Sequence, residues 1–224
     1  KAIDMHFAGR MINSPNDYDV VIKLIPTKND NFFVCMRLCS IQDNRFAYRK
    51  NVLPTSMHPS QAALIVSLAK PYLKEEAQIM DPFCGVGTLL IERAHLVPAR
   101  EIYATDTYGD AITMGRENAA FAKTRINFIH RDFFDFRHDY KFDELITDMP
   151  VRNRQTKAEM ELFYERFFDK AAEHLVSGGI IVMYSNEIGF VKKQIRLRVE
   201  YRLLQETCIL DKKDFYLFVI RYED

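Results

Sequence analysis

The stretch "MDPFCGVGTLLIERA" at residues 80–94 reads as the end of a buried strand, a glycine turn and the start of an apolar-faced helix. Gly85 and Gly87 let the backbone turn sharply and come close to a ligand. In open α/β sheets, ligands lie beyond the carboxyl ends of the strands, where such turns occur. The stretch therefore predicts an α/β fold with a ligand at this turn.

The segments around the turn alternate between strand and helix patterns. Strands are predicted at residues 77–81, 101–106, 126–130, 144–148 and 180–185. Helices are predicted at about 59–73, after the turn to about 96, at 110–122 and at about 157–175. This alternation favours a mainly parallel sheet with helices on both faces, and the strand pair joined by "DKKD" at 211–214 adds an antiparallel hairpin.

The first part of the chain has a different pattern. Alternating apolar residues in 18–40 predict a hairpin around "PTKNDN". We therefore expect residues 1–50 to form a small β-rich connecting region and residues 51–224 to form the main domain.

Composition narrows the function classes. The 31 basic and 31 acidic residues cancel, so a polyanion such as RNA would have to meet a local basic patch. The four cysteines and six histidines lack metal-ligand spacing, so neither a metal site nor a disulfide framework is expected. No apolar run approaches the roughly 20 residues of a membrane span, and no signal peptide opens the chain. We expect a cytoplasmic protein without a membrane segment and, because it begins with Lys, a fragment of a longer chain.

Acidic residues at the strand ends indicate which ligand the turn holds. A dinucleotide fingerprint requires a third glycine where Leu90 stands, and Asp81 would repel a pyrophosphate. A Walker-type phosphate loop is excluded because its Gly-Lys-Ser/Thr is missing. A ligand with an ammonium group near Asp81, a ribose at Asp106 and an adenine near Asp132 fits better. S-adenosylmethionine has all three groups.

Neighbouring residues complete the expected cofactor site. Cys84 has no histidine partner that would make it a nucleophile, so we interpret it as a packing residue. An aspartate at a strand end is also commonly only a helix cap or a turn residue. The candidate cofactor-binding residues are Asp81, Phe83, Cys84, Gly85, Gly87, Thr88, Asp106, Asp132, Phe133 and, before the first helix, His58.

Four segments in order, "DPFCGVGTLLIERA", "ATDTYGDAITMGRENA", "RDFFDF" and "DMP", resemble the THUMP-associated RNA methyltransferases. The preceding "YRKNVLPTSMHPSQAALIVSLA" resembles the entry to their catalytic domain. The resemblance implies a class I, Rossmann-like methyltransferase fold that uses S-adenosylmethionine. It also implies methylation of the exocyclic amine of guanosine in tRNA or ribosomal RNA. The THUMP domain itself is not recognisable in this chain.

One motif departs from that family. Relatives carry Asn or Asp, a further residue, Pro and then an aromatic, whereas this chain has Asp148, Met149, Pro150 and Val151. Asp148 would accept a hydrogen bond from the target amine, and Pro150 would help to aim the backbone carbonyl before it. An aromatic at 151 would stack on a flipped base. With Val there, another aromatic substitutes, the substrate differs, or activity is lost.

Basic clusters suggest where RNA would bind. Arg152, Arg154 and Lys157 follow the motif without an intervening acid, and Arg49 and Lys50 form a second cluster. Such residues would contact phosphates and position RNA without reading its sequence. The "KKQIRLR" run at 192–198 is better explained as a solvated helix face.

Three functions are compatible with these patterns. The leading one is an S-adenosylmethionine-dependent RNA methyltransferase acting on an exocyclic base amine, most of all guanosine N2. A catalytically silent RNA-binding domain that retains the fold is the alternative, and Val151 is its best support. A methyltransferase acting on a protein or a small molecule is the third.

Overall fold

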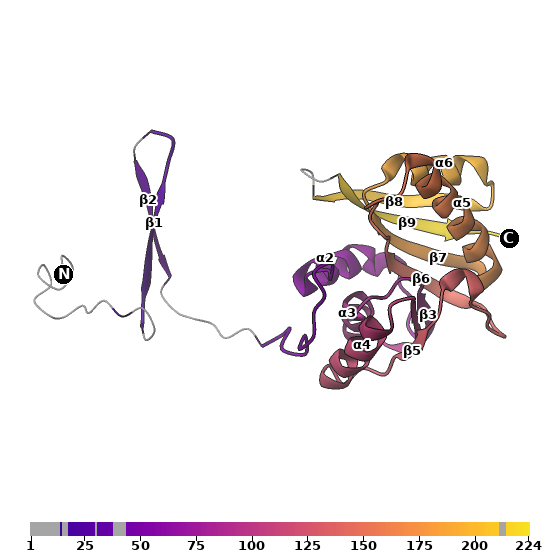
Figure 1. The fold of residues 1–224 in the computed structure, drawn as a ribbon, viewed down its shortest axis with the longest axis horizontal. Helices are drawn as coiled ribbons and strands as arrows, with labels where there is room; N and C mark the ends of the chain where they lie inside the picture. Colours follow the sequence, from indigo (N-terminus) through magenta and orange to yellow (C-terminus); the bar gives the residue numbers. More distant parts are fainter. Residues whose placement is uncertain (1–13, 15–17, 30, 38–43, 211–213) are drawn as a thin grey trace, which may run out of the picture. The chain divides into compact units, whose positions relative to one another are not determined.

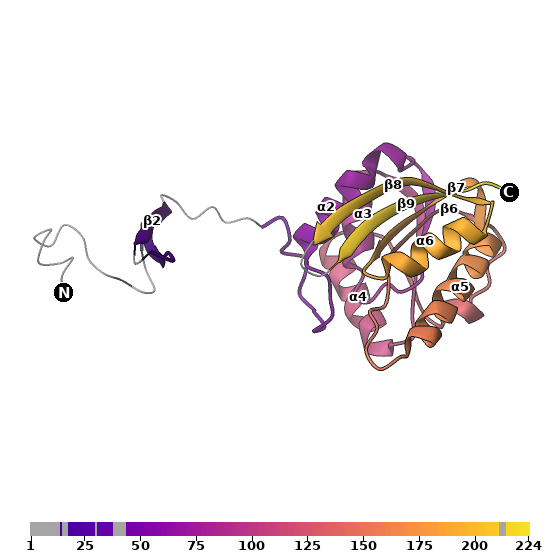
Figure 2. The ribbon, with the colours of Figure 1, turned by 90° about the horizontal axis from the view of Figure 1, so that it is seen from above.

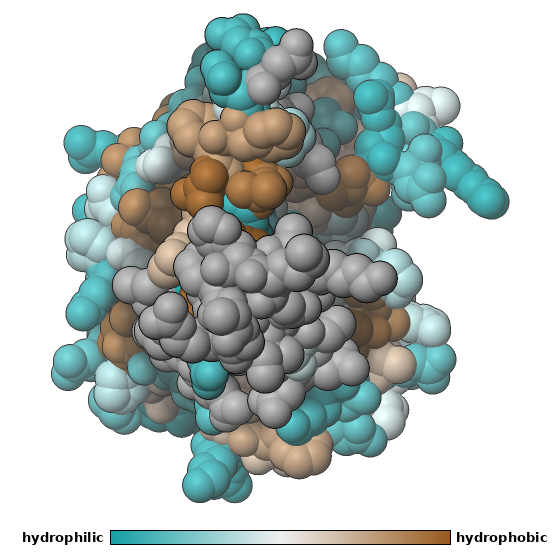
Figure 3. All heavy atoms as spheres, turned by 90° about the vertical axis from the view of Figure 1, so that its left-hand side faces the viewer, coloured by the Kyte–Doolittle hydropathy of each residue, from teal (hydrophilic) through white to brown (hydrophobic). Residues whose placement is uncertain are grey.

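The computed structural model describes residues 14, 18–29, 31–37, 44–210 and 214–224, and the chain divides into two units, Lys1–Arg45 and Phe46–Asp224. In the first unit, β1 (Val21–Pro26) pairs with β2 (Phe32–Arg37) as an antiparallel hairpin. Hydrophobic side chains of this hairpin are exposed. Figure 3 draws the hydrophobic residues of the visible face in brown. The pairing of β1 with β2 confirms the predicted small β-rich extension. Residues 38–40 of the predicted hairpin lie outside the described residues.

The second unit contains a seven-stranded sheet with the order β5-β4-β3-β6-β7-β9-β8. Its strands are β3 (Ala77–Asp81), β4 (Ala99–Asp106), β5 (Asn127–His130), β6 (Phe142–Asp148), β7 (Leu175–Ser185), β8 (Tyr201–Leu210) and β9 (Phe215–Tyr222). The strands β3 to β7 pair in parallel, while β9 runs antiparallel to both β7 and β8. The predicted fold class is confirmed.

Helices cover both faces of this sheet (Figures 1 and 2). One face carries α2 (Pro59–Ala69), α3 (Thr88–Leu96) and α4 (Gly109–Phe121), and the other carries α5 (Lys157–His174) and α6 (Ile188–Leu197). Alternate residues of β7 supply the two cores: Val182 packs in the first, and Ile181 and Met183 pack in the second. Residues 180–183 of β7 are continuously apolar and buried, because helices cover both faces of the sheet there.

Two element boundaries differ from the prediction by four or more residues. The first helix ends at Ala69, and a 3-10 turn follows at Lys70–Tyr72, because Pro71 cannot donate the next helical hydrogen bond. The strand predicted at 180–185 begins earlier, at Leu175, so Gly178 and Gly179 lie inside β7, where Gly178 has φ +81°. The pairing of β6 and β7 shifts between Phe142 and Glu144, so this stretch is a bulge rather than a turn.

A buried ion pair fixes the helix that follows the glycine turn. Arg93 of α3 is fully buried and donates to both carboxylate oxygens of Glu144 in β6, at 2.8 and 2.9 Å. It also donates to the carbonyl oxygens of Val97 and Lys74. This network holds α3 against the sheet, and therefore holds the turn between β3 and α3 in place.

Candidate active site

The glycine turn between β3 and α3 needs both of its glycines. Gly85 and Gly87 have φ +50° and +78°, a left-handed region that disfavours other residues. A Cβ atom at Gly87 would lie 2.7 Å from Cζ of Phe128, whereas a Cβ atom at Gly85 would meet nothing within 4 Å. Gly87 thus allows close packing on β5, and Gly85 leaves its surroundings open to a ligand.

Asp106 ties the end of β4 to this turn. Its Oδ2 accepts from the backbone N–H of Gly85 and its Oδ1 from that of Tyr108, each at 2.8 Å. Each carboxylate oxygen has a second lone pair, so the group can accept further hydrogen bonds. Asp106 therefore holds the turn and still offers an acceptor to a ligand with hydroxyl groups.

Asp81, at the end of β3, is almost completely buried. Burial raises the pKa of Asp81 to about 8, although the backbone N–H of Phe83 donates to its Oδ1 at 3.0 Å, and the nearby Asp148 and Asp106 raise it further. A buried carboxyl group among other carboxylates is stabilised by a cation and repels an anion. The site is suited to a cationic ligand and unsuited to a pyrophosphate.

Asp148 ends the adjacent strand β6. Burial raises its pKa to about 7, and among the described residues none donates a hydrogen bond to its carboxylate. The N–H of Met149 donates to the carbonyl oxygen of Tyr184 in β7 at 2.9 Å, which continues the strand pairing by one residue. Pro150 then leads the chain out to the surface. Asp148 is therefore an acceptor at the end of a strand to which the described part of the chain supplies no donor.

The comparisons with known proteins agree with this geometry. Residues 47–207 match the family described as RMKL-like, methyltransferase domain. The chain belongs to that family. The family and the class I fold confirm the expected resemblance, the enzyme class and S-adenosylmethionine as the cofactor of this domain.

Two curated relatives of this chain differ in the substrate that their names give. The chain is 32% identical to the tRNA (guanine(10)-N2)-dimethyltransferase of Methanothermobacter thermautotrophicus over 78% of its own length and 54% of the relative. It is 25% identical to the release factor glutamine methyltransferase of Lactococcus lactis over 61% of its own length and 56% of the relative. The chain thus spans about half the length of these relatives.

Solved structures share the fold. TrmN from Thermus thermophilus superposes with a TM-score of 0.74 at 20% identity, covering 99% of this chain and 65% of that one. Trm5 from Methanocaldococcus jannaschii, solved in complex with adenosine, gives a TM-score of 0.57 at 19% identity over 75% of this chain and 51% of that one.

The remaining predicted cofactor residues lie around the turn with different environments. The hydroxyl of Thr88 is buried without a hydrogen-bond partner in the described part of the chain, as expected of a group that a ligand satisfies. Burial raises the pKa of Cys84 well above its usual range, which agrees with a packing role. Phe133 is 1% exposed and packs in the second core, against Phe83 and Phe167. A direct cofactor contact by Phe133 stays a prediction.

Asp132 and His58 both cap helices. Oδ1 of Asp132 accepts from the N–H of Phe134 at 2.9 Å at the start of a 3-10 turn, and Nδ1 of His58 accepts from the N–H of Ser60 at the start of α2. Both side chains are exposed. The capping role weighed for strand-end aspartates is therefore present at Asp132, and it leaves the second carboxylate oxygen for a ligand.

The predicted RNA-binding residues differ in the contacts that they already make within the domain. Arg49 donates to the carbonyl oxygens of Ser56 and Met57, and Nζ of Lys50 lies 5.5 Å from the ring centroid of Phe121. RNA contact by these two stays a prediction. Arg152 lies 3.9 Å from Glu187.

Arg154 and Lys157 are exposed near the end of β6, and neither makes an ion pair within the described ranges. The "KKQIRLR" run, by contrast, forms α6 and its end, where Lys192 and Lys193 pair with Glu206 and Glu161. Most of the charge of that helix is therefore neutralised within the domain.

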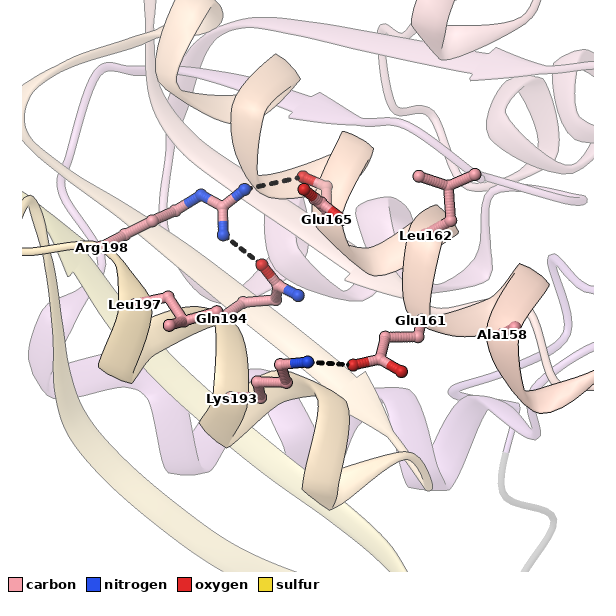
Figure 4. A pocket seen from close by; sticks show the side chains of 8 residues that line it. All are labelled: Ala158, Glu161, Leu162, Glu165, Lys193, Gln194, Leu197 and Arg198. Carbon is pink, nitrogen blue, oxygen red and sulfur yellow. Dashed lines mark hydrogen bonds and ion pairs between the residues drawn. The ribbon is translucent and has the colours of Figure 1, made fainter.

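One groove lies away from the strand ends. It has a volume of about 410 Å³ and runs between α5 and α6 (Figure 4). Arg198 donates to Gln194 and to the carbonyl oxygen of Glu165, and Lys193 pairs with Glu161. These polar groups form hydrogen bonds and an ion pair with one another across the groove. The groove therefore gives no sign of a catalytic site.

Sequence reasoning missed Asn118 of α4. Its side chain is fully buried and accepts from the N–H groups of Lys50 and Asn51, while it donates to the carbonyl oxygens of Asn51 and Val86. It therefore joins the entry segment to the glycine turn. The signal was available, because a polar residue stands on the apolar face of a predicted helix.

Two features are absent from the described residues. No helix among them has the length and hydropathy to cross a membrane. No group of three or more His, Cys, Asp and Glu side chains among them could hold a metal ion.

Proposed function

We propose that this domain methylates an exocyclic amine of a base in RNA, most of all N2 of guanosine in tRNA. The observation that carries the proposal is Asp148, a half-buried acceptor to which no described residue donates, beside Asp81 at the carboxyl ends of adjacent strands. The name of the 32% identical relative, a tRNA guanine-N2 dimethyltransferase, supports the choice of base and of RNA.

The residues around the turn fit S-adenosylmethionine. Asp81 would lie near its positively charged end, Asp106 would accept hydrogen bonds from its ribose hydroxyls, and Asp132 would accept from its adenine amino group. The open space at Gly85 would admit it to the turn. When bound, it supplies a methyl group on a positively charged sulfur.

Asp148 and the backbone carbonyl of Met149 would act on the substrate. Both accept hydrogen bonds from the target amine, which draws its hydrogens into position and turns the nitrogen lone pair toward the methyl group. Pro150 restricts the backbone there, so less orientation has to be fixed during the reaction. Arg154 and Lys157 would contact phosphates of the RNA.

The test combines cells and purified protein. Nucleosides of total RNA from cells with and without the gene are compared by mass spectrometry, and a methylated guanosine that disappears with the gene is expected. In vitro, Asp148→Ala should abolish methylation of that RNA while calorimetry finds cofactor affinity within a few-fold, because the residue acts on the reacting nitrogen.

Two results would replace this proposal. Cofactor binding without methylation of any RNA would favour a silent RNA-binding domain, for which Val151 is the supporting observation. Methylation of a protein glutamine with RNA left unmodified would place the domain closer in function to its second curated relative.

A further inference from the structure

A second pocket lies where the family motif departs from its usual sequence. It has a volume of about 270 Å³ and lies between the loop after β6 and helix α5. Pro150 and Val151 line it from the loop, and Glu159, Met160, Phe163 and Arg166 line it from the helix. Because Pro150 is two residues from Asp148, this pocket opens next to the group that would hold the target amine.

The pocket contains an aromatic ring although position 151 does not. The side chain of Val151 is 51% exposed and offers no aromatic face. Phe163 is half-buried, and its ring centroid lies 5.4 Å from that of Phe83 in the cofactor turn and 5.5 Å from that of Phe134. Packing on both rings fixes Phe163, so a base stacking on it would cost little side-chain entropy.

Charged groups flank this ring on α5. The guanidinium of Arg166 lies 4.1 Å from the ring centroid of Phe134, a geometry that holds its plane against the aromatic cluster. Glu159 is an acceptor, since the backbone N–H of Thr156 donates to it and lowers its pKa. A nucleobase carries both donors and acceptors on its edges, so a pocket with a ring, a cation and an anion matches it chemically.

We propose that this pocket binds the target base and that Phe163 supplies the stacking face that relatives have at position 151. This inference rests on the proposed function, since it assigns the base to the same site. Base–aromatic stacking of about 1 to 3 kcal/mol is enough to hold a flipped base beside Asp148. The domain is then active on RNA with Val at 151.

The kinetic test uses variants of the full chain with total tRNA as substrate. Phe163→Leu keeps an apolar side chain but removes the ring, and it should raise the apparent KM for RNA about tenfold while cofactor affinity and melting temperature change little. Phe163→Tyr should behave as the wild type. Leu197→Ala in α6 is the control, because Leu197 is 65% exposed and does not line this pocket, so the KM for RNA should stay at the wild-type value.

A double variant separates stacking from packing. Adding Val151→Tyr to Phe163→Leu should recover most of the lost affinity for RNA, because it restores an aromatic face on the opposite wall of the pocket. An unchanged KM in Phe163→Leu, with the wild type active, would overturn the inference and leave the proposed function standing.

A readout without turnover keeps the inference testable if the wild type methylates no RNA. Photolabelling with 8-azidoguanosine 5′-monophosphate, in the presence of S-adenosylhomocysteine, is followed by peptide mass spectrometry. Label within residues 150–166 that guanosine 5′-monophosphate displaces, and that Phe163→Leu reduces several-fold, is expected. Labelling elsewhere, or labelling independent of Phe163, would overturn the assignment of the pocket.

Discussion

Asp81, which is buried, and Asp148, which is half-buried, lie at the ends of neighbouring strands, and both have raised pKa values because burial disfavours their charged forms. Nothing in the described part of the chain supplies a cation to either of them. Such groups lower the stability of the empty protein and become useful when a cationic ligand or an amine arrives. Their placement at the carboxyl ends of β3 and β6 therefore agrees with the proposed roles.

The first prediction concerns Asp81→Asn and stability. The folded-state pKa of about 8 exceeds the ordinary value of 3.8, so the stability contribution of this group is present at low pH and is lost as pH rises through about 8. Removing the charge should therefore raise the melting temperature at pH 8.5 by roughly 5 °C or more, with a smaller gain at pH 5. Thermal melts at both pH values measure this.

The same variant should bind S-adenosylmethionine more weakly, because the carboxylate that faces its cationic end is gone. Calorimetry at pH 7 in buffers of different ionisation enthalpy should also find that the wild type releases a proton on binding and that Asp81→Asn does not. A variant that is less stable at high pH, or that binds the cofactor undiminished, would contradict this account of Asp81.

The second prediction concerns the pH dependence of methylation. The ionised form of Asp148 accepts from the amine, so kcat/KM for RNA should rise with pH through about 7 in the wild type. Asp148→Asn should retain part of the activity, since an amide oxygen also accepts, and should lose this rise. A rise of the same midpoint in the Asn variant would assign the titration to another group.

At the scale of the elements, the ring of Phe128 in β5 joins the glycine turn to α4. A Cβ atom at Gly87 would lie 2.7 Å from it, and one at Gly115 would lie 2.6 Å from it. Two glycines far apart in sequence thus make room for one ring. The helix α4, the turn and β5 therefore pack as a unit beneath the cofactor site.

The third prediction compares two helical glycines. Gly115→Ala adds a methyl group against Phe128 and should lower the free energy of unfolding by about 1 to 3 kcal/mol. Gly189→Ala in α6 meets nothing within 4 Å and should be neutral or stabilising by up to about 1 kcal/mol. Chemical denaturation measures both. Phe128→Leu should relieve part of the loss in Gly115→Ala, and equal effects of the two alanines would exclude the steric explanation.

At the scale of the whole molecule, the fourth prediction concerns the domain boundary. Tyr48 is buried and its hydroxyl donates to Glu92 of α3 at 2.6 Å, so Tyr48 belongs to the core of the second unit. A chain of residues 46–224 should melt cooperatively and bind S-adenosylmethionine. A chain of residues 51–224 should melt roughly 5 to 10 °C lower, because it loses a buried ring and leaves Glu92 without that donor. Equal stability of the two would return the boundary to residue 50.

The fifth prediction concerns RNA affinity. The net charge of zero gives no general attraction to RNA, so binding should be weak and should depend on salt through the basic residues near the end of β6. Arg154→Ala should reduce the slope of log affinity against log salt by about one. Lys193→Ala is the control, because its ammonium group pairs with Glu161. Fluorescence polarisation titrations with labelled tRNA at several salt concentrations measure both.

The sequence alone determined the class of fold and the chemistry of the cofactor. Period-2 and period-3.6 patterns identify the elements because burial of apolar side chains follows those spacings, and the strand-end residues Asp81, Asp106 and Asp148 follow from the elements. Leu90 and Asp81 argue against a bound pyrophosphate in the sequence itself. A missing glycine and a nearby carboxylate both act at the turn, so no distant residue has to be known. The missing aromatic at 151 could also be read directly.

Only the tertiary structure decided which residues act together. The carboxyl groups of Asp81 and Asp148 are 67 positions apart in the chain, and their raised pKa values arise from burial that no local pattern reports. In the sequence, Phe163 is one more apolar position on a helix. Its ring lines the pocket beside Val151 because α5 packs beside the loop after β6. Desolvation and long-range packing depend on the folded chain as a whole. For that reason the sequence shows that the aromatic at 151 is missing, but it does not point to Phe163, the replacement that we propose.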